Sequence, residues 1–318
     1  MRSLYFDGEQ INLVNLEKPI RLKGESLVKV LLTSICNTDI EIIKGYKGFT
    51  GVLGHEFVGV VEDSDDEKLI GKRVVGDINI GCGKCRFCKE GYNNHCLDRK
   101  VLGIKDKNGS FAEYITLPNE NLYVVPDSVS DMEAVFAEPM AAALQILQCH
   151  HIRPTDKVVV IGDGKLSQLI TQVVSLSSCH LFVVGKHRDK LDFLKHRAKP
   201  ILLDEVDSLN IEGEFDVAID CTGNDQGLKL AEKLIKAMGT IVLKSTYNSD
   251  GLFNPTNWVV NEMKIVGTRC GPMDAALRLI ERKLVRTDYL VSEVYALEDY
   301  EKAFSKKNKL KVIIDIDK

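Results

Sequence analysis

The strongest constraint on this fold is a run of short apolar segments that alternate with helical patterns between residues 157 and 267. Six of these segments have the composition of buried strands: 157–162, 181–184, 200–203, 215–220, 240–243 and 263–267. Between the first two, five apolar residues fall on one face of a helix: Leu166, Leu169, Ile170, Val173 and Val174. Continuously apolar strands that alternate with amphipathic helices indicate a parallel sheet covered by helices on both faces. We therefore predict an α/β fold that contains a doubly wound, parallel six-stranded sheet.

The glycine-rich turn after the first of these strands is typical of a dinucleotide-binding (Rossmann) domain. Gly162 and Gly164 would permit a tight turn and would let backbone N–H groups approach a pyrophosphate. Lys165 and Leu166 would then open a helix whose N-terminus faces negative charge. Ser167 replaces the third glycine of the fingerprint and is small enough for helix and sheet to pack closely. A lone Gly-x-Gly is weak, but the strand–turn–helix context predicts nucleotide binding at this loop.

The end of the second strand bears on the choice of nucleotide. An NAD-specific site usually has an Asp or Glu there, which accepts hydrogen bonds from the ribose hydroxyls. This chain instead has Gly185, Lys186, His187 and Arg188. A missing carboxylate removes repulsion toward a 2′-phosphate, and Lys186 and Arg188 could pair with such a phosphate. The sequence therefore favours NADP over NAD, and a solvated basic turn without a role stays open as the alternative.

Residues 1–132 have a different sequence pattern, with short strand-like segments bounded by glycine and turn residues. These segments are 27–32, 57–62, 72–76 and 111–116. The remaining patterns are helical at 134–148 and 274–282 and strand-like at 310–315. The tail is too small to fold alone, so we expect it to return to the first domain. We predict a discontinuous β-rich domain of residues 1–132 and 273–318, and a Rossmann domain of residues 133–272.

Four cysteines in the first domain are spaced as a metal-binding knuckle. Cys82, Cys85, Cys88 and Cys96 are separated by two, two and seven residues in a loop that contains glycines. A structural zinc ion needs four soft ligands on a tight loop, and such a site leaves no coordination position open for chemistry. We therefore predict a structural zinc lobe at about residues 80–98, with free thiols scattered in a loop as the alternative.

A second set of metal-type ligands is less conspicuous. Cys36 opens the segment 36–39, and His55 and Glu56 follow a glycine. On its own, one cysteine with a distant His-Glu pair would more often be a buried thiol and a turn. Beside a nucleotide-binding domain and a zinc knuckle, the same residues favour a catalytic metal site. Glu138 adds a carboxylate at the expected junction of the two domains, where we expect a cleft.

These motifs and their order resemble the zinc-dependent medium-chain dehydrogenase/reductase (alcohol dehydrogenase-like) family, in its polyol, threonine and glucose dehydrogenase branch. The segments that carry the resemblance are 36–39, 54–56, the four-cysteine lobe, 111–114, 138–139, the glycine loop and 221–223. The resemblance runs nearly end to end. It implies a GroES-like catalytic domain, a Rossmann domain, and a redox reaction between an alcohol and a carbonyl group.

The resemblance also implies roles for individual residues. The implied ligands of a catalytic zinc are Cys36, His55, Glu56 and, in some members, Glu138. The implied cofactor contacts after the fourth parallel strand are Cys221, Thr222 and Gly223. Thr38 would hydrogen-bond the substrate oxygen and begin a proton relay, with a turn-stabilising threonine as the alternative. Together with the four-cysteine lobe, these assignments imply two zinc ions per chain.

Composition and charge argue against several other classes of function. The net charge is −4, and no basic stripe with interleaved aromatic residues is present, which disfavours a zinc-knuckle protein that binds nucleic acid. No apolar run reaches the roughly 18 residues that a membrane span requires. Nine cysteines, an odd number, and the lack of a signal-peptide pattern favour a reducing compartment. We therefore expect a cytoplasmic protein that binds neither nucleic acid nor membranes.

The leading hypothesis is a zinc-dependent, NAD(P)-linked alcohol dehydrogenase that acts on a secondary alcohol, polyol or sugar. The family resemblance suggests a homodimer or homotetramer. Two alternatives are an NADPH-dependent carbonyl reductase and a catalytically silent redox sensor that binds zinc and nucleotide. The joint presence of Cys36, Thr38 and the His55-Glu56 pair argues against the silent sensor.

Overall fold

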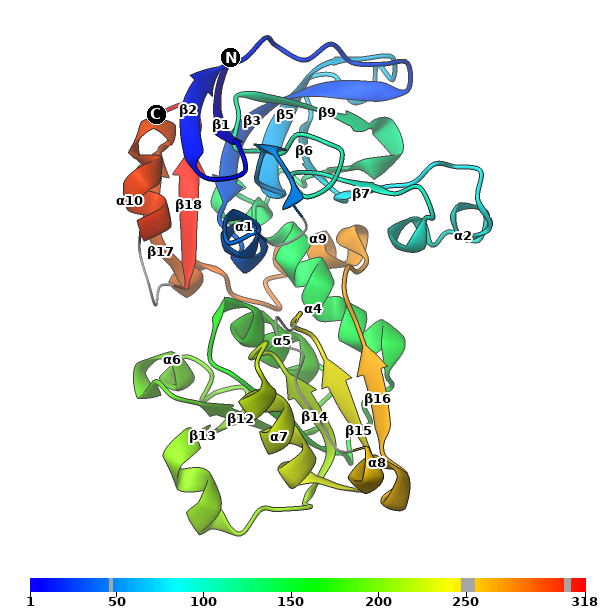
Figure 1. Ribbon diagram of the computed structural model, residues 1–318, viewed down its shortest axis with the longest axis vertical. Helices are drawn as coiled ribbons and strands as arrows, with labels where there is room; N and C mark the ends of the chain where they lie inside the picture. The colour runs from blue at the N-terminus through cyan, green and yellow to red at the C-terminus, as the bar shows by residue number, and fades with distance from the viewer. Residues whose placement is uncertain (46–47, 247–254, 306–309) are drawn as a thin grey trace. The chain divides into compact units, whose positions relative to one another are not determined.

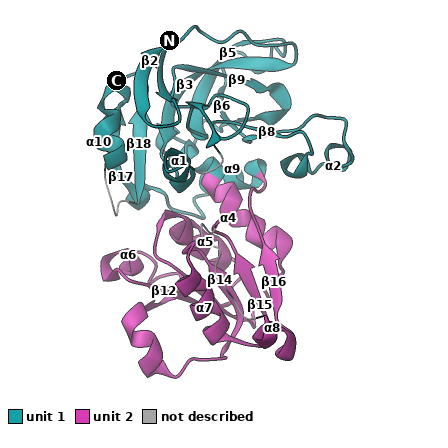
Figure 2. Ribbon diagram, in the orientation of Figure 1, with its two compact units in different colours: residues 1–138, 273–318 teal, residues 139–272 magenta. Residues whose placement is uncertain are grey.

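The computed structural model describes residues 1–45, 48–246, 255–305 and 310–318, and the chain divides into two compact units (Figure 2). Unit 1 consists of Met1–Glu138 and Met273–Lys318, and unit 2 consists of Pro139–Pro272. Among the described residues, no helix has both the length and the apolar character needed to cross a lipid bilayer.

Unit 2 is built on a parallel sheet of six strands in the order β13-β12-β11-β14-β15-β16 (Figure 1). In chain order the strands are β11 Lys157–Ile161, β12 His180–Gly185, β13 Lys199–Leu202, β14 Phe215–Asp220, β15 Ile235–Leu243 and β16 Lys264–Gly267. Every neighbouring pair is parallel. This is the strand order of a dinucleotide-binding doubly wound fold, so the predicted six-stranded sheet is confirmed.

The helical segments of unit 2 connect the strands of this sheet. They are α4 Ala137–Cys149, which begins in unit 1, α5 Lys165–Ser175, α6 Arg188–Asp192, η4 Leu203–Leu209, α7 Asp225–Leu234 and α8 Thr256–Val260. α5 contacts β11 and β12, and α7 contacts β14 and β15 (Figure 1). On the predicted face of α5, Leu169, Ile170, Val173 and Val174 are buried, and Leu166 is half-buried. The polar residues Gln168, Thr171 and Gln172 are buried as well, so α5 is covered on more than its apolar face.

Unit 1 contains a seven-stranded sheet, a three-stranded sheet of β2-β1-β4 and the short pair β7-β8. The first strands are β1 Arg2–Phe6, β2 Ile11–Asn15, β3 Glu25–Ser34, β4 Gly51–Val52, β5 Glu56–Ser64 and β6 Arg73–Gly76. The others are β7 Asn79–Ile80, β8 Lys100–Val101, β9 Tyr114–Pro118, β10 Leu122–Val124, β17 Val291–Ala296 and β18 Lys311–Asp315. The late strand β18 pairs antiparallel with β3, so the tail extends the first sheet.

The helical segments of unit 1 are short and connect these strands. They are α1 Asn37–Ile43, α2 Arg86–Lys89, η2 Asn93–His95, η3 Asn119–Asn121, α3 Asp131–Ala134, α9 Met273–Glu281, η5 Asp288–Leu290, η6 Leu297–Asp299 and α10 Tyr300–Ser305. Phe111 is fully buried and packs edge-on against Phe304, with ring centroids 5.7 Å apart. Phe111 precedes β9, because the strand predicted at 111–116 begins only at Tyr114.

The helix predicted at 134–148 corresponds to α4, which begins only at Ala137, and Ala134 is instead the last residue of the separate short helix α3. α3 is closed at its start by a capping box between Ser130 and Glu133, and α4 starts afresh at Ala137. Pro139 explains the break, because proline has no N–H to donate and is tolerated only in the first turn of a helix. Restarting the helix at Ala137 places Pro139 in that first turn and brings Glu138 to the start of α4.

Candidate functional site

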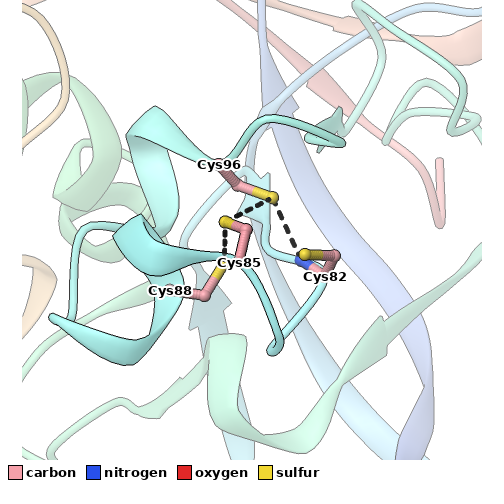
Figure 3. A group of neighbouring side chains, drawn as sticks. All are labelled: Cys82, Cys85, Cys88 and Cys96. Atoms are coloured by element: carbon pink, nitrogen blue, oxygen red, sulfur yellow. Dashed lines mark hydrogen bonds between the residues drawn. The ribbon is translucent and has the colours of Figure 1, made fainter.

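The four-cysteine lobe lies between β7 and β8, and its thiols converge (Figure 3). The Sγ atom of Cys85 lies 3.6 Å from that of Cys88 and 3.8 Å from that of Cys96. The Cys96 sulfur also accepts a hydrogen bond of 3.2 Å from the backbone N–H of Cys82. The turns of α2 and η2 supply this geometry, because α2 begins directly after Cys85 and η2 ends directly before Cys96.

The lobe fits a tetrahedral zinc ion. Zn–S bonds of about 2.3 Å would hold the sulfurs of a tetrahedron about 3.8 Å apart, and the Cys85 sulfur lies 3.6 Å and 3.8 Å from those of Cys88 and Cys96. Backbone N–H groups of Cys88 and Leu97 lower the pKa of Cys85 to about 6, while desolvation and neighbouring thiols raise the pKa of Cys88 to about 12. Thiols this close resist joint ionisation, and a divalent cation would relieve that repulsion.

The second cluster consists of Cys36, His55 and Glu56, whose ligand atoms all lie within 4.8 Å of one another. Cys36 is the residue before α1, and Glu56 is the first residue of β5. The antiparallel register of β3 and β5 pairs Ser34 with Glu56, which brings the two segments together. Gly54 lets the chain enter β5, because its φ is +92° and a Cβ there would lie 2.8 Å from the backbone nitrogen of Phe111.

Asp39 ties the cluster together from α1. One of its carboxylate oxygens accepts a hydrogen bond from the backbone N–H of Cys36 at 2.8 Å, and the other accepts one from Gly54 at 3.2 Å. The same second oxygen lies 3.2 Å from Nδ1 of His55, a buried nitrogen that no partner meets in hydrogen-bond geometry. A carboxylate behind an imidazole fixes the ring for metal binding. Burial lowers the pKa of His55, but Asp39 and Cys36 raise it more, so the net pKa is well above its ordinary value.

Sequence reasoning missed the cation that faces Glu56. Lys311 of β18 is 1% exposed, and its ammonium forms an ion pair with the Glu56 carboxylate. The hydroxyl of Ser34 donates to the same carboxylate oxygen. The only signal in the sequence is a lysine within the apolar segment 310–315, and nothing there says what it pairs with. Lys311 offsets one of the negative charges around the cluster, which lowers the cost of burying them.

The structure places two further predicted residues beside this cluster. The Cys36 thiol lies 3.7 Å from the Thr38 hydroxyl oxygen, to which it donates. Glu138 is half-buried, and its pKa is raised to about 7. Desolvation is the largest cause; the charge of His55 opposes this rise and that of Glu56 adds to it. Within the part of the chain that the structure describes, the mutually close set has three ligand residues, and Glu138 is not one of them. A cation bound nearby would favour the ionised form of Glu138.

The donor chemistry of the second cluster fits a catalytic zinc ion. One thiolate, one imidazole and one carboxylate are the ligand types found in such sites, which leave a position for water or substrate. The cluster differs from the lobe in this respect, because the lobe offers four ligands of one kind. The residues present therefore fit two sites of different character, one closed and one open.

The glycine loop makes a tight turn between β11 and α5 and leaves its backbone uncovered at Gly164. Gly162 has a φ of +121° and donates its N–H to the carbonyl of Val184. Gly164 is the N-cap of α5, and a Cβ there would meet no atom within 4 Å, so the backbone is open to a ligand. Lys165 and Leu166 open the helix as predicted. The buried Ser167 hydroxyl donates to the carbonyl of Gly162 at 2.6 Å, which closes the loop on the helix.

The predicted turn after β14 lies against this loop. A Cβ on Gly162 would lie 3.6 Å from Cys221, whose backbone N–H donates to the carbonyl of Ile161. The Thr222 hydroxyl donates to the buried carboxylate of Asp220 at 2.8 Å. Gly223 has a φ of +70°. Burial raises the pKa of Cys221, so the thiol stays protonated and acts as a small apolar group.

The basic turn after β12 is arranged differently from the expectation. Arg188 forms an ion pair of 2.8 Å with Glu205, and both side chains are about half exposed. His187 lies 2.9 Å from the Asp163 carboxylate. Lys186 is exposed. His187 and Arg188 therefore already have acidic partners, and the sequence pattern did not predict either pairing.

Comparison with known proteins agrees with this arrangement. Residues 22–127 match the alcohol dehydrogenase GroES-like domain family. The chain is 26% identical to D-arabitol-phosphate dehydrogenase of Enterococcus avium over 96% of this chain and 94% of the relative. It is 28% identical to sorbitol dehydrogenase of Halalkalibacterium halodurans over 91% of this chain and 90% of the relative.

A solved structure extends the comparison to the whole fold. The alcohol dehydrogenase rspB of Escherichia coli CFT073, in complex with NADH, is 25% identical and has a TM-score of 0.90 over 99% of both chains. The fold, the two ligand clusters and these relatives confirm the resemblance that the sequence predicts. The match to the GroES-like domain and these relatives support a zinc-dependent medium-chain dehydrogenase/reductase of the alcohol dehydrogenase-like family.

Proposed function

We propose that this protein is a zinc-dependent, NAD(P)-linked alcohol dehydrogenase that transfers hydride between a secondary alcohol of the polyol or sugar class and nicotinamide. The observation that carries the proposal is the cluster of Cys36, His55 and Glu56, three unlike metal ligands within 4.8 Å of one another. The substrate class is supported by relatives that act on arabitol phosphate and sorbitol. Zinc, when bound, would supply a Lewis acid that lowers the pKa of an alcohol, and the nucleotide would accept hydride.

The residues of this chain would divide the work as follows. Cys36, His55 and Glu56 would hold the catalytic ion, with Glu138 as a further ligand. Thr38 would hydrogen-bond the substrate oxygen and begin a proton relay, passing its own hydroxyl proton onward as it accepts the substrate's, because its hydroxyl lies beside the Cys36 sulfur. The Gly162–Gly164 turn and the N-terminus of α5 would bind the pyrophosphate. The turn at 221–223 and the basic turn at 185–188 would border the rest of the nucleotide.

The four-cysteine lobe would bind a second, structural zinc, because four thiolates leave no open coordination position. We further propose that residues 1–132 with 273–318 form the catalytic domain and residues 133–272 the nucleotide-binding domain. We also propose a homodimer or homotetramer. None of the nine cysteines is joined in a disulfide bond, which supports a reducing compartment such as the cytoplasm.

The test combines metal analysis with a substrate panel. Purified protein is assayed with polyols, aldoses, amino alcohols and short secondary alcohols by the absorbance of the reduced nucleotide. Cys36→Ala should reduce zinc from two ions to one and turnover by about a thousandfold or more, because a metal ion contributes several kcal/mol to such reactions. Cys149→Ala is the matched control, since Cys149 is exposed and belongs to neither cluster. Full zinc content and activity in Cys36→Ala would refute the proposed site.

A further inference from the structure

Asp163, the residue between the two glycines of the cofactor loop, reaches across to the end of β12. Its Oδ2 accepts hydrogen bonds from the backbone N–H of Lys186 at 2.6 Å and of His187 at 2.8 Å. The same oxygen lies 2.9 Å from Nδ1 of the His187 ring, and the Asp163 side chain is 11% exposed. Oδ1 takes part in none of these three contacts. A carboxylate is therefore built into the turn where the sequence shows only basic residues.

Gly185 makes room for this carboxylate. A Cβ built on Gly185 would lie 2.6 Å from the Asp163 Cβ and 2.8 Å from its Oδ2, closer than real side chains tolerate. The end of β12 carries no acidic residue of its own, but the carboxylate of Asp163 from the glycine loop occupies the space beside Gly185. In a dinucleotide-binding fold, an acidic group at this place meets the ribose of the adenosine half.

The same contacts affect a nucleotide that carries a 2′-phosphate. Consecutive backbone N–H groups in a turn are good phosphate donors, but those of Lys186 and His187 already bind Asp163. The guanidinium of Arg188 is paired with Glu205. Desolvation raises the pKa of Asp163, but hydrogen bonds from His187 and Lys186 outweigh it and leave the pKa below its ordinary value. The carboxylate is thus ionised at neutral pH.

We propose that Asp163 sets the nucleotide preference of this enzyme: its carboxylate accepts a hydrogen bond from the ribose 2′-hydroxyl of NAD(H) and repels the 2′-phosphate of NADP(H). The inference rests on the proposed function, because it requires a nicotinamide nucleotide at this loop. It predicts the preference opposite to the one that the residues at 185–188 favour. The two predictions differ because the carboxylate of Asp163 belongs to the loop after β11, whereas the residues at 185–188 follow β12 and include no acid.

The test is direct binding, measured by isothermal titration of NADH and NADPH into the purified zinc-loaded protein. The wild type should bind NADH more tightly than NADPH. Asp163→Asn should shift the ratio of the two affinities toward NADPH by roughly tenfold, the effect of removing one like charge at close range near a surface. Asp192→Asn, at the exposed last residue of α6, removes the same charge and should leave the ratio unchanged.

A second variant separates charge from loop structure. Asp163→Ser keeps a hydroxyl acceptor for the turn N–H groups and should shift the ratio in the same direction. If both variants bound NADH and NADPH more weakly by the same factor, Asp163 would only stabilise the loop structure, and the inference would be overturned. Tighter NADPH binding by the wild type, or an unchanged ratio in Asp163→Asn, would overturn it while leaving the proposed function intact. Binding of neither nucleotide to the wild type would overturn both.

Discussion

The two ligand clusters of unit 1 differ in how the chain builds them. The lobe takes four ligands of one kind from the single loop between β7 and β8, and three of the four cysteines are half-buried. The cluster at Cys36 takes three different ligands from two segments that meet through the pairing of β3 with β5. It also needs Lys311 from the far end of the chain. Four ligands of one kind can therefore be gathered by a single loop, whereas the three unlike ligands around Cys36 are brought together by tertiary structure.

This difference predicts opposite consequences of removing a ligand from each cluster. Cys85→Ser should remove the lobe zinc and lower the free energy of unfolding by about 4 kcal/mol or more, because structural zinc in small folds contributes on the order of 10 kcal/mol. Turnover per folded molecule should fall less than tenfold, since the lobe has no open position. The measurements are chemical denaturation, zinc content and turnover.

The outcome of Cys85→Ser is to be compared with that of Cys36→Ala, which should lower turnover by about a thousandfold or more with little loss of stability. If both variants lost activity to the same degree while folded, the lobe would have a part in catalysis and the distinction between the two clusters would be wrong.

The next largest effect concerns the buried ion pair of the Cys36 cluster. Lys311→Met leaves the Glu56 carboxylate without its buried cation and should destabilise the zinc-free protein by about 3 kcal/mol. The loss should be smaller in the zinc-loaded protein, because the metal ion takes over part of the compensation of charge. Thermal and denaturant unfolding with and without a chelator would measure both values.

Lys302→Met is the matched control for Lys311→Met. Lys302 is an exposed lysine paired with Asp299 at 2.7 Å, and losing a surface pair of this kind costs less than about 1 kcal/mol. An equal loss of unfolding free energy in the two variants would contradict the role given to Lys311. A larger loss for Lys311→Met in the zinc-loaded protein than in the zinc-free protein would contradict it as well.

The smallest effect should come from the residue that orients His55. Asp39→Asn keeps an oxygen beside the imidazole but removes the charge, and should weaken zinc at the Cys36 cluster by about 10- to 100-fold. Zinc at the lobe should be unaffected, because Asp39 contacts only Cys36, His55 and Gly54 among the polar partners described above. Competition with a chelator would resolve the two ions, and equal weakening of both would show that the clusters are not independent.

The parts of the fold that follow from local pattern could be predicted from the sequence. The six parallel strands lie close to their predicted positions, because each is a short apolar run bounded by turn residues. β15 begins earlier, at Ile235 instead of residue 240, since Ile235 also pairs with Phe215 before a shift of register. The glycine loop opens α5 at Lys165 as expected, because a strand–turn–helix motif is a local structure.

The parts that depend on contacts between distant residues were not predictable. Lys311 is one lysine in an apolar strand until β18 pairs with β3 and brings it to Glu56. Asp163 is an unremarked residue of the glycine loop until the parallel pairing of β11 with β12 places it beside Gly185. Both are charged side chains whose partners lie far away in the sequence, and a linear pattern carries no information about such partners.

The sequence by itself determined the fold class, the family resemblance, the spacing of the lobe cysteines and the residue types of the candidate ligands around Cys36. These are set by hydrophobic period, turn chemistry and ligand type, which act over a few neighbouring residues. Only the tertiary structure decided that Asp39 stands behind His55, that Lys311 offsets Glu56 and that a carboxylate occupies the basic turn after β12. The reason is physical: the energy of a buried charge depends on what surrounds it in space, and folding alone brings those surroundings together.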